Sequence, residues 1–163
     1  MINKKIVSLN SLTQKMIHLK KEGKKIVFTN GCFDLLHIGH VHYLNAAKKK
    51  GHILIVALNS DSSVKRLKGP TRPINTLKDR MTVISALECV DFVTSFSDDT
   101  PLKLIEKLKP TVLVKGGDWK PSQIVGAKEV LGWGGKVFSL PFVKGKSTTR
   151  TLNKINSANN TDS

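Results

Sequence analysis

Short runs of aliphatic and β-branched residues alternate with amphipathic segments along this chain of 163 residues. Each run is bounded by polar residues or glycine and has the length of one buried strand. The amphipathic segments repeat apolar positions at helical spacing, and the first closes at Gly23, where a left-handed helix cap is common. The expected strands are 25–30, 52–58, 91–96, 111–115 and 136–141, and the expected helices are 11–22, 39–50, 76–88, 100–108, 122–131 and 147–156.

This alternation predicts an α/β fold. A crossover between parallel strands needs a dozen or more residues, and strands covered on both faces are continuously apolar. We therefore expect a doubly wound, Rossmann-like, five-stranded parallel sheet with helices on both faces. It would form one domain over residues 1–155, followed by a disordered polar tail over 156–163. Ligands of such sheets bind beyond the carboxyl ends of the strands, where the strand order reverses.

The chain is strongly basic, with 27 Lys and Arg against 12 Asp and Glu and a formal net charge of +15. This balance suits nucleic acid, a membrane surface or an anionic small substrate, and it does not choose among them. No apolar run is long enough to span a bilayer and no secretory signal is recognisable, so we expect a cytoplasmic protein. Cys32 and Cys89 lie far apart, which argues against a thiolate zinc site or a redox pair.

Residues able to do chemistry gather after the predicted strands. The segment "NGCFDLLHIGH" follows the first strand, "NSDSSVKRLKG" the second, "KGGDW" the fourth and "PFVKGKSTT" the fifth. The carboxyl ends of parallel strands share one edge of the sheet. We therefore expect these four loops to converge on one site.

Two histidines frame the start of the helix expected after the first strand. His37 and His40 share one face of the first turn, where free N–H groups and the helix dipole favour an anion. Gly39 leaves room for a phosphate, and Gly31 lets the backbone approach a ligand. On this motif alone, an alternative stays open, in which both histidines are structural residues of the helix that pack against its neighbours or face solvent. Asp34 can orient a histidine, assist a metal or cap the helix.

Other polar residues follow the later strands. Lys65 and Lys68 lie in a segment expected to be a loop, and residues 147–149 have capping chemistry for the last helix. A solvated loop and an ordinary capped helix are the competing explanations. Asp118 in "KGGDW" can contact a sugar hydroxyl or a base, and Trp119 can stack on a ring or cover the core.

Five motifs, taken in order, resemble a known family. They are His-x-Gly-His, "NSD" with "KRLKG", "R-M-x-x-x-x-A-L-E-x-V-D" from Arg80 to Asp91, "LVKGGDW" and "STT". Over about residues 10–156 the chain resembles nucleotidyltransferases of the cytidylyltransferase-like superfamily. Within it, the chain is most similar to the branch that adenylylates D-glycero-D-manno-heptose 1-phosphate. That activity is often one half of a bifunctional protein with a sugar kinase, and this chain resembles the free-standing form.

The resemblance implies an activity and its partners. AMP would pass from ATP to the anomeric phosphate of the heptose, giving pyrophosphate and an ADP-heptose for lipopolysaccharide core or S-layer glycan synthesis. Mg²⁺ would be held mainly through the ATP phosphates, without a metal site of the protein's own. The resemblance also implies a homodimer without nucleic-acid or membrane partners. The segment 86–93 resembles the one that pairs subunits, and core packing is its competing explanation.

The resemblance further implies roles for single residues. His37 and His40 would stabilise charge on the ATP phosphates, and either Lys65 or Lys68 would be the essential lysine. Lys146 departs from the family, where cysteine is more frequent at this place. The residues expected to bind the nucleotide are Thr29, Asn30, Gly31, Cys32, Phe33, Asp34, Gly39, Asn59, Asp61, Arg80, Lys115, Gly116, Asp118, Trp119, Ser147, Thr148 and Thr149.

Two alternatives accompany this expectation. Within the superfamily, the chain is also compatible with a cytidylyltransferase acting on glycerol 3-phosphate or a related alcohol phosphate. From a different class, the charge of +15 would suit a basic nucleic-acid-binding module. Only 6% of the residues are aromatic and no RNA-binding signature is present, which disfavours that class.

Overall fold

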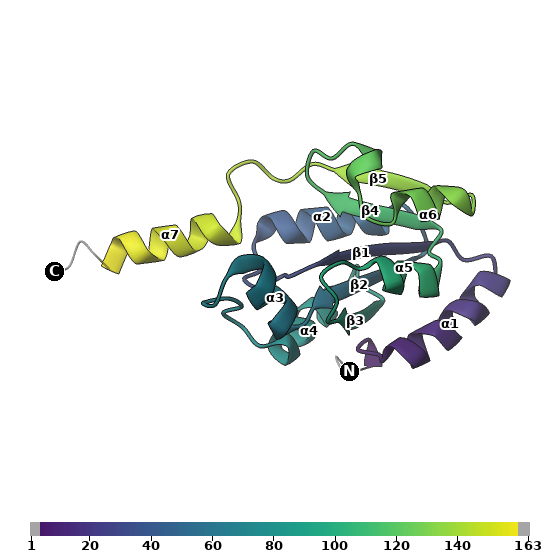
Figure 1. Cartoon of the computed structure of the whole chain (residues 1–163), viewed down its shortest axis with the longest axis horizontal. Helices are drawn as coiled ribbons and strands as arrows, with labels where there is room; N and C mark the ends of the chain where they lie inside the picture. The colour runs from purple at the N-terminus through teal and green to yellow at the C-terminus, as the bar shows by residue number, and fades with distance from the viewer. Residues whose placement is uncertain (1–3, 160–163) are drawn as a thin grey trace.

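The computed structural model describes residues 4–159, in which strands alternate with helices (Figure 1). The strands are β1 (Ile26–Gly31), β2 (Ile53–Asn59), β3 (Phe92–Phe96), β4 (Val112–Gly116) and β5 (Lys136–Leu140). The helices are α1 (Leu9–Lys21), α2 (Ile38–Lys48), α3 (Asp61–Lys68), α4 (Leu77–Ser85), α5 (Leu102–Leu108), α6 (Ala127–Gly132), α7 (Thr148–Asn159) and the 3-10 helix η2 (Pro121–Gln123). Within residues 4–159, no helix combines the length and the apolar character that crossing a bilayer requires.

The five-stranded sheet is parallel and has the strand order β3-β2-β1-β4-β5. Val27 of β1 lies in register with Leu54 of β2 on one side and with Val112 of β4 on the other. The chain winds outward from β1 to β3 and then returns to continue from β4 to β5. The strand order therefore reverses between β1 and β4. The expected doubly wound fold is confirmed, and the reversal marks where a ligand should bind.

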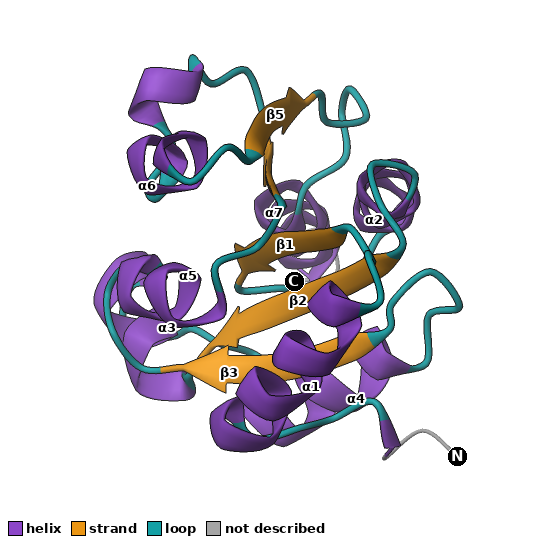
Figure 2. Cartoon of the chain, turned by 90° about the vertical axis from the view of Figure 1, so that its right-hand side faces the viewer, coloured by secondary structure: helices purple, strands orange, loops and turns teal. Residues whose placement is uncertain are grey.

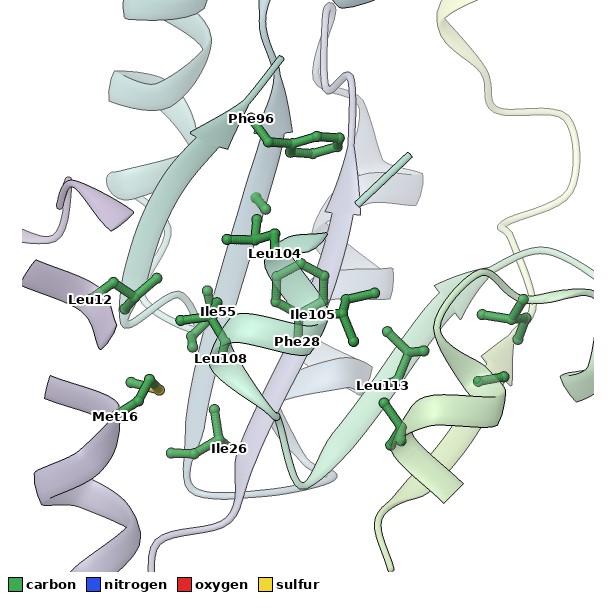
Figure 3. Close-up of a cluster of buried hydrophobic side chains, with 14 residues drawn as sticks. Leu12, Met16, Ile26, Phe28, Ile55, Phe96, Leu104, Ile105, Leu108 and Leu113 are labelled. Carbon is green, nitrogen blue, oxygen red and sulfur yellow. The ribbon is translucent and has the colours of Figure 1, made fainter. Parts of the chain in front are cut away.

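Helices cover both faces of the sheet (Figure 2). Successive side chains of a strand point to opposite faces, so Phe28 packs in the layer with α1, α5 and α6, and Val27 in the layer with α2 and α4. Figure 3 shows the first layer, where Ile105 of α5 lies beside Phe28 and Leu12 of α1 belongs to the same cluster. In the second layer, Tyr43 of α2 is buried against the sheet. This burial on both sides fixes where the strands end, and so where the loops begin.

The largest departure from the sequence prediction is α3, which replaces a predicted loop. The side chain of Ser60 caps this helix by accepting from the Ser63 amide at 3.2 Å, and Gly69 ends it with φ +102°. Val64 is its fully buried apolar residue. One short helix with so little apolar surface carries no periodic signal, which is why the pattern did not reveal it.

The last helix also differs from its predicted bounds. α7 continues through residues 156–159, which the sequence assigned to a disordered tail. Residues 160–163 of that predicted tail lie outside the described residues. The segment from Thr148 to Asn159 contains no glycine or proline that would end the helix earlier. Figure 1 shows α7 extending away from the sheet, with its amino end near α2 and the loop after β5.

Candidate active site

A pocket of about 640 Å³ opens at the carboxyl edge of the sheet. It is lined by the loops that follow β1, β4 and β5 and by the ends of β2 and α3, so the segments expected to converge do meet. The predicted site residues that line it are Asn30, Gly31, Cys32, Phe33, Asp34, His37, His40, Asn59, Lys68, Lys115, Gly116, Trp119, Ser147, Thr148 and Thr149.

The two histidines stand together at the amino end of α2. His37 has extended backbone at the position before the helix, and its ring stacks on that of His40 with centroids 3.9 Å apart and planes 23° apart. The backbone N–H of His37 donates to Nδ1 of His40 at 3.4 Å. Nδ1 of His37 is buried and has no hydrogen-bond partner among the residues that the structure describes. A buried polar atom without a partner is unusual, and the residue that carries this one lines the pocket.

Burial keeps both rings neutral. It lowers the pKa of His40 to about 4, and the neighbouring His37 contributes to the lowering. Burial also lowers the pKa of His37, and the charge of Lys146 adds to this effect. A neutral imidazole that accepts at Nδ1 carries its proton on Nε2. His40 therefore presents an Nε2–H donor, beside the free N–H groups of the first turn of α2.

Gly39 sits between the histidines for a steric reason. A Cβ at this position would come within 2.9 Å of the His37 ring and within 3.6 Å of the Lys146 Cβ. Such a contact would displace the ring from its stacked position. Gly39 thus permits the histidine arrangement, and it does not itself line the pocket.

Lys68 and Lys115 reach the pocket from different elements. Lys68 is the last residue of α3, and Lys115 lies near the end of β4. Burial lowers the pKa of Lys115, and the charge of Lys68 lowers it further. Lys65 is exposed on α3 and does not line the pocket. Of the two lysines between which the sequence left a choice, the structure brings Lys68 to the site.

The "STT" segment forms the amino end of α7. Ser147 Oγ accepts from the amide of Arg150 at 3.1 Å, which is capping geometry. Thr148 Oγ1 donates to the carbonyl of Leu35 at 3.1 Å and so ties α7 to the loop after β1. Lys146 precedes this cap and also lines the pocket. A second helix amino end with its free N–H groups therefore borders the same space as the start of α2.

Arg80 was expected to bind the nucleotide, and the structure places it behind the pocket. Its guanidinium donates to the carbonyls of Cys32, Asn59 and Asn75 and to Asp61 Oδ1, over 2.6–3.1 Å. The residue is 1% exposed. It joins the ends of β1 and β2 to the start of α3. Asp61 is the acceptor in this network and does not line the pocket.

Asp34 anchors a loop and neither caps α2 nor contacts a histidine. Its carboxylate accepts from Arg72 Nε at 2.7 Å and from the amides of Ile74 and Asn75 at 2.9 Å. Burial alone would raise the pKa of Asp34, but these hydrogen bonds outweigh burial and hold the pKa below its usual value. The carboxylate is therefore ionised and fully engaged, which leaves it unsuited to hold a metal.

Two predicted binding residues use their side chains within the protein. Thr29 Oγ1 lies 2.5 Å from the hydroxyl of Tyr43, which in turn donates to the carbonyl of Val114 at 3.2 Å. Asn59 Nδ2 donates to Ser63 Oγ at 3.0 Å. Thr29 does not line the pocket. Burial raises the pKa of the Cys32 thiol, so this pocket residue is not a thiolate at neutral pH.

The "KGGDW" turn builds an aromatic rim. Gly117 has φ +113°, and a Cβ on Gly116 would come within 2.6 Å of the Phe142 ring. Trp119 Nε1 donates to the carbonyl of Gly116 at 3.0 Å, which holds the indole at the pocket edge with 46% of the residue exposed. Asp118 is exposed and does not line the pocket. The turn therefore presents a ring and backbone to a ligand, and directs its carboxylate elsewhere.

The sequence did not point to several residues of the pocket. They are mostly apolar, and in a sequence such residues cannot be told from core positions; Tyr43 is buried, whereas Phe142 is 59% exposed at the rim. The additional lining residues are Tyr43, Leu67, Asp99, Thr100, Pro101, Leu113, Gln123, Ile124, Val125 and Phe142.

The donors of the pocket are cationic or neutral. Over residues 4–159, no group of three or more His, Cys, Asp or Glu side chains is arranged to hold a metal ion. The arrangement instead offers two helix amino ends, two histidines and several cations. That combination suits a highly anionic ligand such as a polyphosphate.

Comparison with known proteins identifies relatives of this arrangement. Residues 28–151 match the cytidylyltransferase-like family model. The chain is 53% identical over 150 residues to the bifunctional protein HldE of Coxiella burnetii and 54% identical over 150 residues to that of Klebsiella pneumoniae. The matches cover 92% of this chain and 32% and 31% of the two relatives. The chain thus spans about a third of the length of these proteins.

Solved structures resemble the fold. A lipopolysaccharide core biosynthesis protein from Thermoplasma volcanium matches with a TM-score of 0.61 and 28% identity, over 76% of this chain and all of the other. A pantoate-beta-alanine ligase from Francisella tularensis matches with a TM-score of 0.62 over 91% of this chain and 72% of the ligase. Its identity of 17% supports a shared fold only.

Proposed function

Because this chain belongs to the cytidylyltransferase-like family, we propose that it transfers AMP from ATP to D-glycero-D-manno-heptose 1-phosphate. The products are pyrophosphate and an ADP-heptose that serves lipopolysaccharide core or S-layer glycan synthesis. The sequence identity of 53–54% to HldE proteins over 150 residues supports this choice of substrates. The structural similarity to a lipopolysaccharide core biosynthesis protein supports it as well. The alternative with CTP and glycerol 3-phosphate is a branch of the same family.

The observation that carries the proposal is the pairing of neutral histidines with two helix amino ends around one pocket. Nε2–H of His40 and the free N–H groups of α2 can donate to phosphate oxygens without a change of protonation. Lys68 and Lys115 add positive charge from other elements. Donors that are fixed before the ligand arrives stabilise charge that develops on it without reorganising.

The chemistry needs no protein nucleophile. An oxygen of the sugar phosphate attacks the α-phosphorus of ATP, and the bond from that phosphorus to the oxygen bridging to the β-phosphate breaks. The leaving pyrophosphate takes the electron pair of the broken bond. His40 stabilises the negative charge that accumulates on these oxygens, and Lys68 and Lys115 hold the reacting groups in line.

Magnesium enters with ATP as part of the substrate. Asp34 is engaged by Arg72 and by backbone amides, and the described residues contain no carboxylate cluster that would cage the ion. The donor set therefore fits a magnesium ion held by ATP phosphates and water. When bound, the ion would supply positive charge that offsets the charge of the phosphates.

The apolar side of the pocket suits the base. Leu113 and Ile124 line the pocket floor, and Trp119 and Phe142 stand at the rim. A flat apolar surface is what a purine ring needs for stacking. These contacts support binding of a nucleotide base and do not select adenine over cytosine.

We also propose a cytoplasmic homodimer. The segment 86–93, a candidate for pairing subunits, places Cys89, Val90 and Val93 in the core of its own subunit. Glu88 remains exposed there. Any subunit contact through this segment must therefore use its polar side chains and its ends. Sedimentation equilibrium measures the mass of the protein in solution and so distinguishes a monomer from a dimer.

Four reactions test the proposed function. Pyrophosphate release with magnesium is measured for ATP and CTP, each with heptose 1-phosphate and with glycerol 3-phosphate. We expect release with ATP and heptose 1-phosphate alone. Release only with CTP and glycerol 3-phosphate would move the chain to the alternative branch. Silence in all four, with tight RNA binding that ATP does not displace, would favour the nucleic-acid-binding class.

A further inference from the structure

Arg72 is held in the pocket by a buried carboxylate. Its Nε donates to Asp34 Oδ2 at 2.7 Å, and the two side chains are 13% and 1% exposed. Asp34 also accepts from the amides of Ile74 and Asn75, so its position is fixed by the segment that follows Arg72. The guanidinium plane of Arg72 is thereby oriented before any ligand binds, and its charge is balanced by Asp34.

The outer edge of this guanidinium is not used by the protein. Among residues 4–159, neither Nη atom of Arg72 has a hydrogen-bond partner, and the residue lines the pocket. Two other arginines nearby donate to protein acceptors through more of their guanidinium nitrogens. Arg80 donates through Nε and both Nη atoms to protein acceptors, and Arg66 donates through Nε and Nη2 to Asp99 and Ser97. Arg72 alone of these three keeps a pair of N–H donors on its outer edge for a ligand.

The cations of the pocket fall into two groups. Lys146 lies beside His37 and the amino end of α7, where a Cβ on Gly39 would come within 3.6 Å of its own Cβ. Arg72 and Lys68 lie near Cys32, and the charges of both act against burial by lowering the pKa of its thiol. The proposed reaction brings two phosphorylated substrates into one pocket, so two separate groups of donors match its need.

We infer that Arg72, oriented by Asp34, binds the phosphate of the sugar 1-phosphate acceptor. A planar guanidinium held at Nε presents its two outer N–H groups as a fork, which matches two oxygens of a phosphate. The triphosphate then lies toward the histidines, Lys146 and the start of α7. Arg72 is a specificity-determining residue for the acceptor. The inference rests on the proposed function.

The test separates the KM values of the two substrates. For Arg72→Gln we expect the KM for heptose 1-phosphate to rise about 10- to 100-fold, the scale of losing a hydrogen bond to a charged group. The KM for ATP should change less than about threefold. Arg72→Lys keeps the charge against Asp34 but loses the fork, so we expect a smaller rise in the acceptor KM. Lys103→Gln is the control, because it removes a cation whose ion pair with Asp98 is largely exposed.

Different results identify different failures. A rise in the KM for ATP without one for the acceptor would overturn the inference, and so would unchanged values for both substrates. If Arg72→Gln fails to fold, Arg72→Lys decides by the same two KM values. The wild-type protein tests the proposed function separately. Turnover with another phosphorylated acceptor would remove the heptose assignment, and the acceptor KM of the Arg72 variants would still support or overturn the role of Arg72.

Discussion

The two walls of the pocket are built differently. The β1–β2 wall consists of residues 30–40, 59–61 and 72–80, and it is tied by buried charges: Arg80 is 1% exposed and Asp34 is 4% exposed. The α7 wall, residues 142–149, is mostly exposed, and Phe142 leaves 59% of its surface open. Its tie to the β1–β2 wall is the bond from Thr148 to Leu35.

This difference separates stability from ligand binding. Charged groups removed from water must be paired, so the β1–β2 wall is expensive to disturb. Exposed polar groups in the α7 wall exchange protein contacts for water at little cost. We therefore expect substitutions in the β1–β2 wall to lower the stability of the fold, except where the replaced side chain lies at the pocket surface. Those in the α7 wall should change substrate binding alone.

The largest effect on activity is expected at the pocket surface of the β1–β2 wall. Replacing His40 with Ala should lower turnover about 100- to 1,000-fold, because it removes a fixed donor to the reacting phosphates. The unfolding temperature should stay close to that of the wild type. Pyrophosphate release and thermal unfolding measure the two quantities. Turnover near the wild-type value would remove this histidine from the mechanism.

The largest effect on stability is expected behind that surface. Replacing Arg80 with Met should lower the free energy of unfolding by about 3 kcal/mol, because Asp61 and the carbonyls of Cys32 and Asn59 lose their donor. Urea unfolding measures the change. Arg66→Met is the matched control, since the Arg66–Asp99 ion pair is exposed. Equal losses for the two variants would contradict the contrast between buried and exposed arginines.

A smaller and purely functional effect is expected in the α7 wall. Replacing Thr148 with Val should raise the KM for ATP about five- to tenfold, because the amino end of α7 loses a hydrogen bond of about 1 kcal/mol to Leu35. Thr82→Val, which removes a bond within α4, serves as the control. An unchanged KM for ATP would show that this tie does not position the helix.

The smallest effect is on the pH dependence of stability. The pKa of His40 is about 4 in the folded chain, below the ordinary value of 6.5, so the unfolded chain binds more protons between these values. The contribution of His40 is complete above pH 6.5 and is lost as pH falls toward 4. Unfolding measured over this window should show a shallower slope for His40→Asn than for the wild type. Equal slopes of the free energy of unfolding against pH for the two proteins would contradict the assignment of His40 as a buried neutral ring.

The sequence predicted the parts of the fold that depend on continuous apolar runs. Runs such as residues 52–58 are buried on both faces of the sheet. Their continuous apolar sequence therefore predicts both the strand and the parallel sheet to which it belongs. Helix α3 was missed because Val64 is its one fully buried apolar side chain. A segment that is held by capping and by one contact leaves no periodicity to detect.

Within the site, the sequence predicted which loops converge better than what each side chain does. His37, Lys68 and Ser147 line the pocket as expected. Arg80 and Asp34 have local sequences that suit ligand binding, but apart from the Asn75 carbonyl near Arg80 the partners lie 19 to 48 residues away, and only the fold reveals them. Apolar lining residues such as Phe142 carry no chemical signature, and for that reason they could not be predicted.

The central claim is that an oxygen of the acceptor phosphate forms the new bond to the α-phosphorus of ATP, and isotope transfer tests it most directly. Heptose 1-phosphate labelled with ¹⁸O on its phosphate is incubated with ATP, magnesium and the protein, and the products are analysed by mass spectrometry. The account predicts that the ADP-heptose retains all of the label and that the pyrophosphate carries none. Label in the pyrophosphate, or unlabelled ADP-heptose, would contradict it.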